Sequence, residues 1–410
     1  MEGRSKNWKQ KGLGLIPWAV GAVLAAGLGL YGYVLATMTP LHPTTEGIRS
    51  VTHGGPLPQW TAAVEQAQAA VRAGLAEQNL PGLSVAVAAG GNLVWAEGFG
   101  WADLDKRIAV APETLFPIGT ASTALTSAAV GLLLEKGLLK LDDEIQAYVP
   151  EFPVKQWPVR LQQLMGHVAG VTTDSGDEGP LFAEQCERPV DALQHFAGRS
   201  LLFEPGTEFR NSSYGWILMS AAVEAAAKEP FVRFMRKEVF EPLGMDNTRA
   251  DSSTEPIQDR VTSYFPRFAA DTRYGPDPMR ELNISCYAGS SAFLSTPSDL
   301  VRFALSINSG KLLRPATVQS LQTSQRLASS EETGYGLGWD LETATISGKP
   351  TRVVGHDGDS LGGMVSSLMI FPELELVIAV TSNVSYADTY GLGVKIAQAF
   401  ADHARGPARE

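Results

Sequence analysis

The sequence is poor in cysteine and lacks the residue patterns that bind metal ions. Only Cys186 and Cys286 occur in 410 residues, which excludes a small domain held together by several disulfides. In an exported domain the two could pair, but we interpret them as two small buried hydrophobic residues. The H-x-H, H-E-x-x-H and C-x-x-C patterns are absent, so we expect no metal site and no cofactor.

The sequence also lacks a stripe of positive charge. It has 33 lysines and arginines against 44 aspartates and glutamates, a net charge of −11. We therefore expect no nucleic-acid partner. The composition, with 44% hydrophobic and 19% charged residues, is typical of a globular protein with a large core.

One long hydrophobic run is present near the N-terminus. Residues 13–38 carry no charge and are long enough to cross a hydrocarbon layer of ~30 Å. Basic residues precede the run and none follows until Arg49. This asymmetry predicts a cytoplasmic tail at 1–12, a single-pass transmembrane anchor at 13–38 and a periplasmic domain. A cleavable signal peptide is the alternative. The Pro- and Gly-containing residues 39–58 predict a linker.

The exported domain is expected at residues 59–405, with strands at both ends and helices between them. Helical spacing of apolar residues predicts a helix at 60–78, and alternation predicts a hairpin within 83–99. The middle of the chain is mostly helical, and a polar, Pro-rich insertion lies at about 251–285. Further expected helices are 161–165, 190–196, 214–227, 231–240 and 388–403, and further strands are 335–339, 352–355, 364–371 and 376–381. This order predicts an α+β fold, an antiparallel sheet built from both chain ends and flanked by helices, with an inserted helical subdomain.

Residues 116–141 are the segment around which the chain is organised. An extended approach ends at Gly119, and a helix follows that is apolar all round, as helices buried in the centre of a domain are. Gly137 ends the helix. Hydroxyl groups gather in its first turn, at Thr120, Ser122 and Thr123. They either cap the helix or face a ligand, because free N–H groups there favour negative charge.

Sequence landmarks in a fixed order connect residues 60–403 to a known family. They are L-F-P-I-G at 115–119, L-M-G-H-V-A-G at 164–170, P-G-T at 205–207, Y-G-L-G-W at 335–339 and H-D-G at 356–358. The chain resembles the serine β-lactamase and penicillin-binding-protein superfamily. Within it, the chain is most similar to the class-C-like branch, which includes D-aminopeptidases, esterases and the mitochondrial serine β-lactamase-like protein. The resemblance implies a β-lactamase/transpeptidase-like fold.

The first motif of this family is S-x-x-K, which starts the buried helix. Its serine attacks the substrate and its lysine activates the serine. The matching positions here are Thr120 and Thr123. Moving the register to Ser122 places Leu125 at the lysine position, which is worse. The resemblance therefore implies that both catalytic groups of this motif are replaced.

The second and third motifs are preserved to different degrees. The family's Y-x-N, or Y-x-S/T, falls on Asn211 and Ser213, and asparagine cannot shuttle a proton. An alternative register at 209–211 supplies an aromatic ring but no hydroxyl. The third motif, H-x-G, remains as His356 and Gly358, which the resemblance places beside the substrate. His356 either touches a ligand or is a hydrogen-bonded histidine at a strand end.

The replaced residues decide the functional prediction. Loss of a catalytic nucleophile or base costs on the order of 10⁴ to 10⁶ in rate. We therefore predict a pseudoenzyme that binds a small peptide- or ester-like ligand, or a partner, without turning it over. One alternative is an active amide or ester hydrolase that uses Thr120 or a rearranged centre. Another is a self-assembling structural protein, by analogy with the mitochondrial relative. His167 is expected to hold its own loop.

Overall fold

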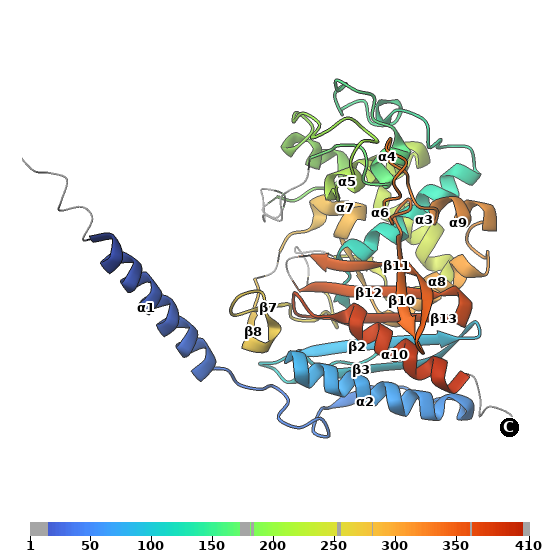
Figure 1. Ribbon diagram of the computed structural model, residues 1–410. Coiled ribbons are helices and arrows are strands. Elements are labelled where there is room, and N and C mark those ends of the chain that lie inside the picture. Colours follow the sequence, from blue (N-terminus) through green and yellow to red (C-terminus); the bar gives the residue numbers. More distant parts are fainter. Residues whose placement is uncertain are drawn as a thin grey trace, which may run out of the picture.

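The main sheet joins the two ends of the domain that follows the N-terminal helix (Figure 1). The computed structural model describes residues 15–404 except 173–180, 182–183, 252–255, 281 and 361–362, so the predicted tail at 1–12 lies outside it. The strand order is β1-β3-β2-β13-β12-β11-β10, with β4 beside β3, and each pairing is antiparallel. The strands are β1 (Ser50–Thr52), β2 (Gly82–Ala89), β3 (Asn92–Asp103), β4 (Ile108–Ala109), β10 (Asp340–Ile346), β11 (Lys349–Ser360), β12 (Met364–Phe371) and β13 (Leu376–Ser382).

The pairing of β2 with β13 confirms that the sheet is built from both chain ends. Both strands are buried along their whole length. Successive side chains of a strand point to opposite faces, and β2 uses this to serve two cores. Val85 and Val87 belong to one core, whereas Ala86 and Ala88 belong to the other. The sheet is therefore covered on both faces.

Helices cover the two faces in different ways (Figure 1). Helices α2 (Thr61–Gln78) and α10 (Thr389–Ala404) pack against each other and cover one face, and α8 (Pro297–Asn308) packs on the other. The inserted helical region lies beside β11 and surrounds α3 (Ser122–Glu135), most of whose residues are buried, as predicted. Its other helices are α4 (Leu161–Met165), α5 (Ser213–Ala227), α6 (Phe231–Phe234), α7 (Ala288–Ser291) and α9 (Pro315–Leu321).

Short strands bring the chain into and out of this helical region. Strands β5 (Phe116–Pro117), β9 (Phe293–Ser295) and β6 (Arg249–Ala250) form a small sheet directly before α3. Strands β7 (Tyr264–Pro266) and β8 (Pro276–Pro278) form a hairpin within the expected polar insertion. The segment expected as a helix at 190–196 is a 3-10 helix, Pro189–His195.

Cys186 and Cys286 form a disulfide bond, so the prediction of two unpaired buried residues is wrong. Their Cα atoms lie 4.8 Å apart although 100 residues separate them in the chain. Cys286 belongs to the 3-10 helix Ser285–Tyr287, which leads into α7. Sequence spacing does not reveal the bond because only the packing of the helical region brings the two residues together.

The segment 39–58, expected to be a linker, is packed against the domain over much of its length. Strand β1 pairs with the edge of β3, and Ile48 is buried. The Arg72 guanidinium donates to the Ser50 hydroxyl at 2.8 Å. His42 Nε2 is 2.8 Å from the Leu80 carbonyl oxygen. The packed structure therefore starts before residue 59, because the open edge of β3 has unpaired backbone groups that β1 satisfies.

Residues 335–339, expected to be a strand, form a turn instead. Tyr335 makes an isolated bridge to Asp340, where β10 begins. Gly338 has a φ of 94°, and a Cβ there would lie 2.8 Å from the Trp216 ring. A left-handed backbone of this kind suits glycine and interrupts a strand. The strand prediction therefore fails because the backbone turns at Gly338.

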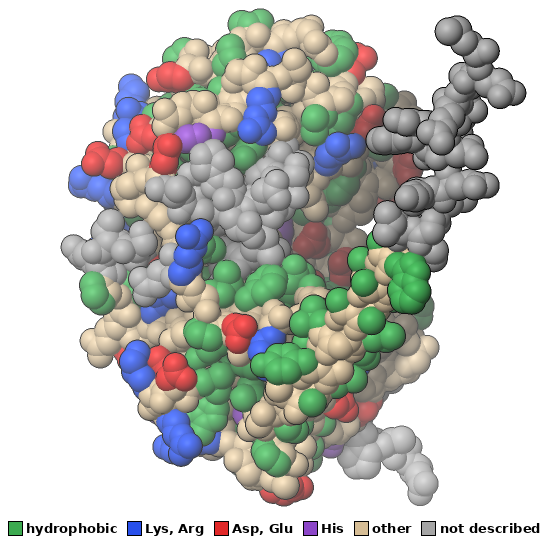
Figure 2. Space-filling model, turned by 90° about the vertical axis from the view of Figure 1, so that its left-hand side faces the viewer, with side chains coloured by type: hydrophobic (Ala, Val, Ile, Leu, Met, Phe, Trp, Pro, Cys, Tyr) green, Lys and Arg blue, Asp and Glu red, His purple; other side chains and the backbone are tan. Residues whose placement is uncertain are grey.

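Helix α1 (Leu15–Ala36) projects away from the domain (Figure 1), and hydrophobic side chains gather along it (Figure 2). Val23, Leu24 and Leu28 are 71%, 62% and 72% exposed. The residues Trp18–Ala36 are long and apolar enough to cross a membrane, and 6% of the most apolar part of this helix is buried by the domain. An apolar helix left uncovered by its own domain needs a bilayer or another cover.

Candidate functional site

The N-terminal end of α3 rests directly on strand β11. A Cβ at Gly358 would lie 2.0 Å from the Ile118 carbonyl oxygen, so only glycine fits at that position. The Ser366 hydroxyl of β12 donates to the same carbonyl at 2.8 Å. The Thr120 hydroxyl donates to the Asp357 carbonyl oxygen at 3.0 Å. The structure thus brings Thr120, His356 and Gly358 together at one end of the helix.

Three hydroxyl groups of α3 donate to backbone carbonyls of neighbouring segments, whereas the buried Ser122 hydroxyl has no hydrogen-bond partner among the described residues. Thr123 donates to the Ser290 carbonyl at 3.4 Å, and Thr126 donates to the Gly289 carbonyl at 2.7 Å, both in α7. Ser127 donates to the Leu337 carbonyl at 2.6 Å. The expectation that Thr120, Ser122 and Thr123 cap the helix is wrong, because the capping position is Ala121 and no side chain caps there. A 3-10 turn, Gly119–Ala121, precedes the helix and leads directly into it.

Thr120 has no base beside it within the described part of the chain. Its one hydrogen bond there goes to a peptide carbonyl, and no lysine or tyrosine bonds to its hydroxyl. Thr123, at the position of the family's lysine, is 2% exposed. Its hydroxyl is three residues further along the same helix and is held by α7. The hydrogen bond of the Thr120 hydroxyl therefore leads to a backbone carbonyl and not to a side-chain base of the kind that activates a nucleophile.

Asn211 is exposed and lies just before α5. Its neighbour Ser212 makes the structural contacts: the Ser212 hydroxyl accepts from the Gly215 N–H at 3.3 Å and donates to the Thr172 carbonyl at 2.8 Å. Ser213 is the first residue of α5 and is partly buried. Within the described residues, Asn211 makes no hydrogen bond to the start of α3.

His167 is a structural residue of this region. Its Nδ1 accepts the Ser212 N–H at 3.1 Å, and its ring centroid lies 4.8 Å from that of Tyr335. Burial, followed by the charge of nearby His356, lowers the pKa of His167 from 6.5 to about 3. The ring is therefore neutral near physiological pH, which leaves Nδ1 free to accept.

Tyr335 is a site residue that the sequence presents only as part of a family landmark. Its hydroxyl lies 2.9 Å from His356 Nε2, and His356 Nδ1 lies 2.7 Å from the Asp357 carbonyl oxygen. Because a carbonyl only accepts, Nδ1 donates to the Asp357 carbonyl, and the Tyr335 hydroxyl is the hydrogen-bond partner of Nε2. Burial raises the pKa of Tyr335 well above 10, so the phenol stays protonated.

This arrangement joins the two strand-side candidates to the helix. The Asp357 carbonyl oxygen accepts from both the Thr120 hydroxyl and His356 Nδ1. The Asp340 carboxylate lies 3.7 Å from His356 Nδ1, on the neighbouring strand β10. Thr120, Asp357, His356 and Tyr335 are thus linked in one hydrogen-bonded network.

Comparison with known proteins identifies the scaffold. A family model described as Beta-lactamase matches residues 67–402, most of the chain. The chain belongs to the beta-lactamase family. Penicillin-binding protein 4* of Bacillus subtilis (strain 168) is 28% identical over 300 residues, which cover 70% of this chain and 64% of that protein. The chain therefore aligns with less than two thirds of this relative's length.

Other members of the beta-lactamase family are similar over comparable lengths. The mitochondrial serine beta-lactamase-like protein LACTB of Homo sapiens is 25% identical over 387 residues, covering 72% of this chain and 70% of that protein. The structure of the octameric penicillin-binding protein homologue from Pyrococcus abyssi has a TM-score of 0.68 at 22% identity, covering 82% and 76% of the two chains. EstCE1, a hydrolase with promiscuous acyltransferase activity, has a TM-score of 0.66 at 21% identity, covering 84% and 99%. The two structures support the beta-lactamase fold.

Proposed function

We propose that this beta-lactamase-family protein is a membrane-anchored pseudoenzyme that binds a ligand or partner without turning it over. The observation that carries the proposal is the hydrogen bond from the Thr120 hydroxyl to the Asp357 carbonyl oxygen. A nucleophilic hydroxyl must pass its proton to a base as it attacks. A peptide carbonyl accepts a hydrogen bond but does not take up a proton near neutral pH.

The positions matching the family's other catalytic groups support the same conclusion. Thr123 carries no amine and is held by the Ser290 carbonyl, and Asn211 is exposed and has no phenol. Loss of the nucleophile's base alone lowers rates by a factor on the order of 10⁴ or more. A threonine hydroxyl without either partner is therefore expected to be inert toward amides and esters.

The strand side of the site supports a binding role. His356 and Gly358 of β11 occupy the positions that face substrate in the family, and Ser213 occupies the last position of the second motif. These residues favour a small peptide- or ester-like ligand. Such a ligand would contact them as a substrate does in the family, without being cleaved.

The N-terminal helix and the disulfide support export of the domain. Helix α1 is apolar and exposed, and four basic residues precede it, at Arg4, Lys6, Lys9 and Lys11, which favours a cytoplasmic N-terminus. The Cys186–Cys286 bond favours an oxidising compartment such as the periplasm. N-terminal sequencing of the membrane-bound protein distinguishes a retained anchor from a cleaved signal peptide.

Covalent labelling tests the pseudoenzyme proposal. Purified full-length protein in detergent is treated with a fluorescent penicillin and with a fluorophosphonate, and no covalent adduct is expected. Adduct formation that disappears in Thr120→Val, but persists in the control Thr126→Val, would show an active threonine nucleophile and overturn the proposal. Calorimetry with D-alanyl peptides and esters then tests binding, with loss of binding expected in His356→Gln.

A further inference from the structure

The hairpin 264–278, which contains β7 and β8, contacts the C-terminal end of helix α1. The Arg267 guanidinium donates to the Val34 carbonyl oxygen at 3.4 Å and to the Thr37 hydroxyl at 3.1 Å. The Tyr274 side chain also lies near that of Tyr31 in α1. Val34 is buried, although most of α1 is exposed. The hairpin therefore lies against the last turns of the anchor.

The position of these contacts along α1 fixes the depth of the hairpin. The apolar span ends at Ala36. At about 1.5 Å per residue, Val34 lies roughly 3 Å and Tyr31 roughly 7.5 Å before that end. In a bilayer crossed by α1, this is the layer where hydrocarbon gives way to lipid headgroups. Residues that contact α1 here must lie at that layer, whatever the tilt of the helix.

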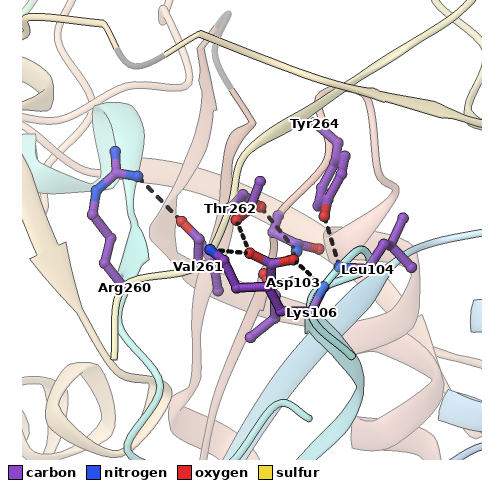
Figure 3. A network of polar contacts seen from close by, with 9 residues as sticks. Asp103, Leu104, Lys106, Arg260, Val261, Thr262 and Tyr264 are labelled. Carbon is purple, nitrogen blue, oxygen red and sulfur yellow. Dashed lines mark hydrogen bonds and ion pairs between the residues drawn. The ribbon is translucent and has the colours of Figure 1, made fainter. Parts of the chain in front are cut away.

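The hairpin is held rigidly at its base. The Tyr264 hydroxyl accepts the Leu104 N–H at 2.8 Å, and the Thr262 hydroxyl donates to the Asp103 carboxylate at 2.9 Å, which also binds Lys106 (Figure 3). The Tyr264 N–H donates to the Asn383 carbonyl at the end of β13, at 2.8 Å. These bonds fix the position of the hairpin relative to the main sheet.

The side chains of the hairpin suit a membrane interface. Phe268 and Tyr274 pack edge to face, with ring centroids 5.5 Å apart, and Phe265 packs on Tyr386, which is 41% exposed. Amphipathic aromatic rings are enriched at this level of a bilayer. Arg273 is exposed and forms an ion pair with Asp271. The exposed part of the hairpin therefore offers aromatic rings and a charge-balanced pair, and no excess of positive charge.

We infer that the hairpin 264–278 is a docking surface for the phospholipid interface, which holds the domain against the outer face of the membrane. The inference rests on the proposed role of α1 as an anchor. Its partner is a lipid bilayer of zwitterionic headgroups, because the charges of Arg273 and Asp271 balance. Arg267 is the positioning residue that ties the hairpin to α1.

A single fluorescent label tests the docking. The chain has two cysteines and both are in the disulfide, so Ala270→Cys, an exposed residue at the tip, gives one reactive thiol. The matched control is Asn92→Cys, at an exposed residue. Asn92 pairs with Ala89 at one end of β2. The hairpin 264–278 is attached at the opposite end of this strand, where Leu83 pairs with Ser382. Each full-length variant is reconstituted into phosphatidylcholine vesicles that contain a headgroup spin-labelled lipid.

The lipid quencher is expected to reduce the fluorescence at position 270 and to leave that at position 92 unchanged. Arg267→Gln should restore part of the fluorescence at 270. Equal quenching at positions 270 and 92 would overturn the inference. If the first variant folds poorly, Asp277→Cys, which is exposed on β8, repeats the test. Flotation separates the two proposals: failure to float with vesicles removes the anchor, whereas floating protein with an unquenched label removes only the docking.

Discussion

Helix α3 and strand β11 meet at the site, and their polar groups are used in different ways. At the start of the helix, the hydroxyl of Thr120 in the preceding 3-10 turn and those of Thr123 and Thr126 in α3 donate to backbone carbonyls. On the strand, His356 keeps a side-chain partner, Tyr335, and Gly358 keeps the close approach of the helix. The helix side is therefore held by backbone acceptors, whereas the strand side keeps a side-chain pair and the tight contact between strand and helix.

Removing the disulfide should have the largest effect on the helix side. Cys286 immediately precedes Tyr287 and α7, whose carbonyls hold Thr123 and Thr126. Closing a loop of about 100 residues stabilises by roughly 4.7 kcal/mol in the chain-entropy model. The free energy of unfolding of the double variant Cys186→Ala/Cys286→Ala should therefore be lower by about that amount, and its urea midpoint should lie at a lower concentration. Reductant should destabilise the natural chain and leave the double variant unchanged; equal midpoints would contradict the expectation.

On the strand side, Gly358→Ala should destabilise the protein by about 3 kcal/mol. The added Cβ would meet the Ile118 carbonyl oxygen at 2.0 Å, and backbone atoms cannot move aside as a side chain can. The control is Gly198→Ala, where nothing lies within 4 Å. Thermal unfolding compares the two. If both variants melt at the temperature of the natural chain, the close contact between helix and strand is not real.

Acidification should lower the stability of the protein through His167, which packs beside Tyr335 between the helix side and the strand side of the site. Because the pKa of His167 is lowered from 6.5 to about 3 in the folded state, the unfolded chain binds more protons between these values. The free energy of unfolding should therefore fall as pH decreases below about 6.5, by roughly 1.4 kcal/mol per pH unit from this group. Burial also lowers the pKa of His42, which adds in the same direction.

The variant His167→Asn isolates this contribution. Asparagine does not titrate, offers an oxygen to the Ser212 N–H and tolerates the positive φ of 59° found here. Urea unfolding between pH 5 and pH 7 should show a shallower pH dependence in this variant, while the exposed control His53→Gln should keep the original slope. An unchanged slope in His167→Asn would place the pH sensitivity elsewhere.

The smallest expected effect concerns the side-chain pair on the strand. Tyr335→Phe removes the hydrogen-bond partner of His356 Nε2, and loss of one buried hydrogen bond costs about 1 kcal/mol. The nitrogen NMR signal of His356 Nε2 should shift, because the ring then lacks this hydrogen bond. A signal that stays in place would mean that Tyr335 and His356 do not pair in solution.

The sequence predicts the fold well because the family's landmarks are local and occur in order. The helix at Ser122–Glu135, the hairpin β2–β3 and the final helix all lie where apolar spacing places them. The motif positions at Thr120 and His356 are also brought together. Local patterns suffice for these features, since each depends on residues a few positions apart.

Features set by distant contacts were not predictable. The Cys186–Cys286 bond spans 100 residues, and the pairing of Tyr335 with His356 depends on a turn where a strand was expected. The pairing of β1 with β3 depends on the free edge of β3, and the composition of residues 39–58 does not indicate it. In each case the deciding partner lies elsewhere in the chain, beyond the reach of periodicity.

The pairing of β2 with β13 also has a consequence for how the protein is made. Residues near 85 cannot acquire their neighbour on one side until residues near 380 are available, and such distant pairings form slowly. A chain threaded across a membrane from its N-terminus would therefore hold its first strands incomplete until nearly all of it had crossed. Export would then be finished before the central sheet closes, which keeps the chain in a form that a translocation channel can pass.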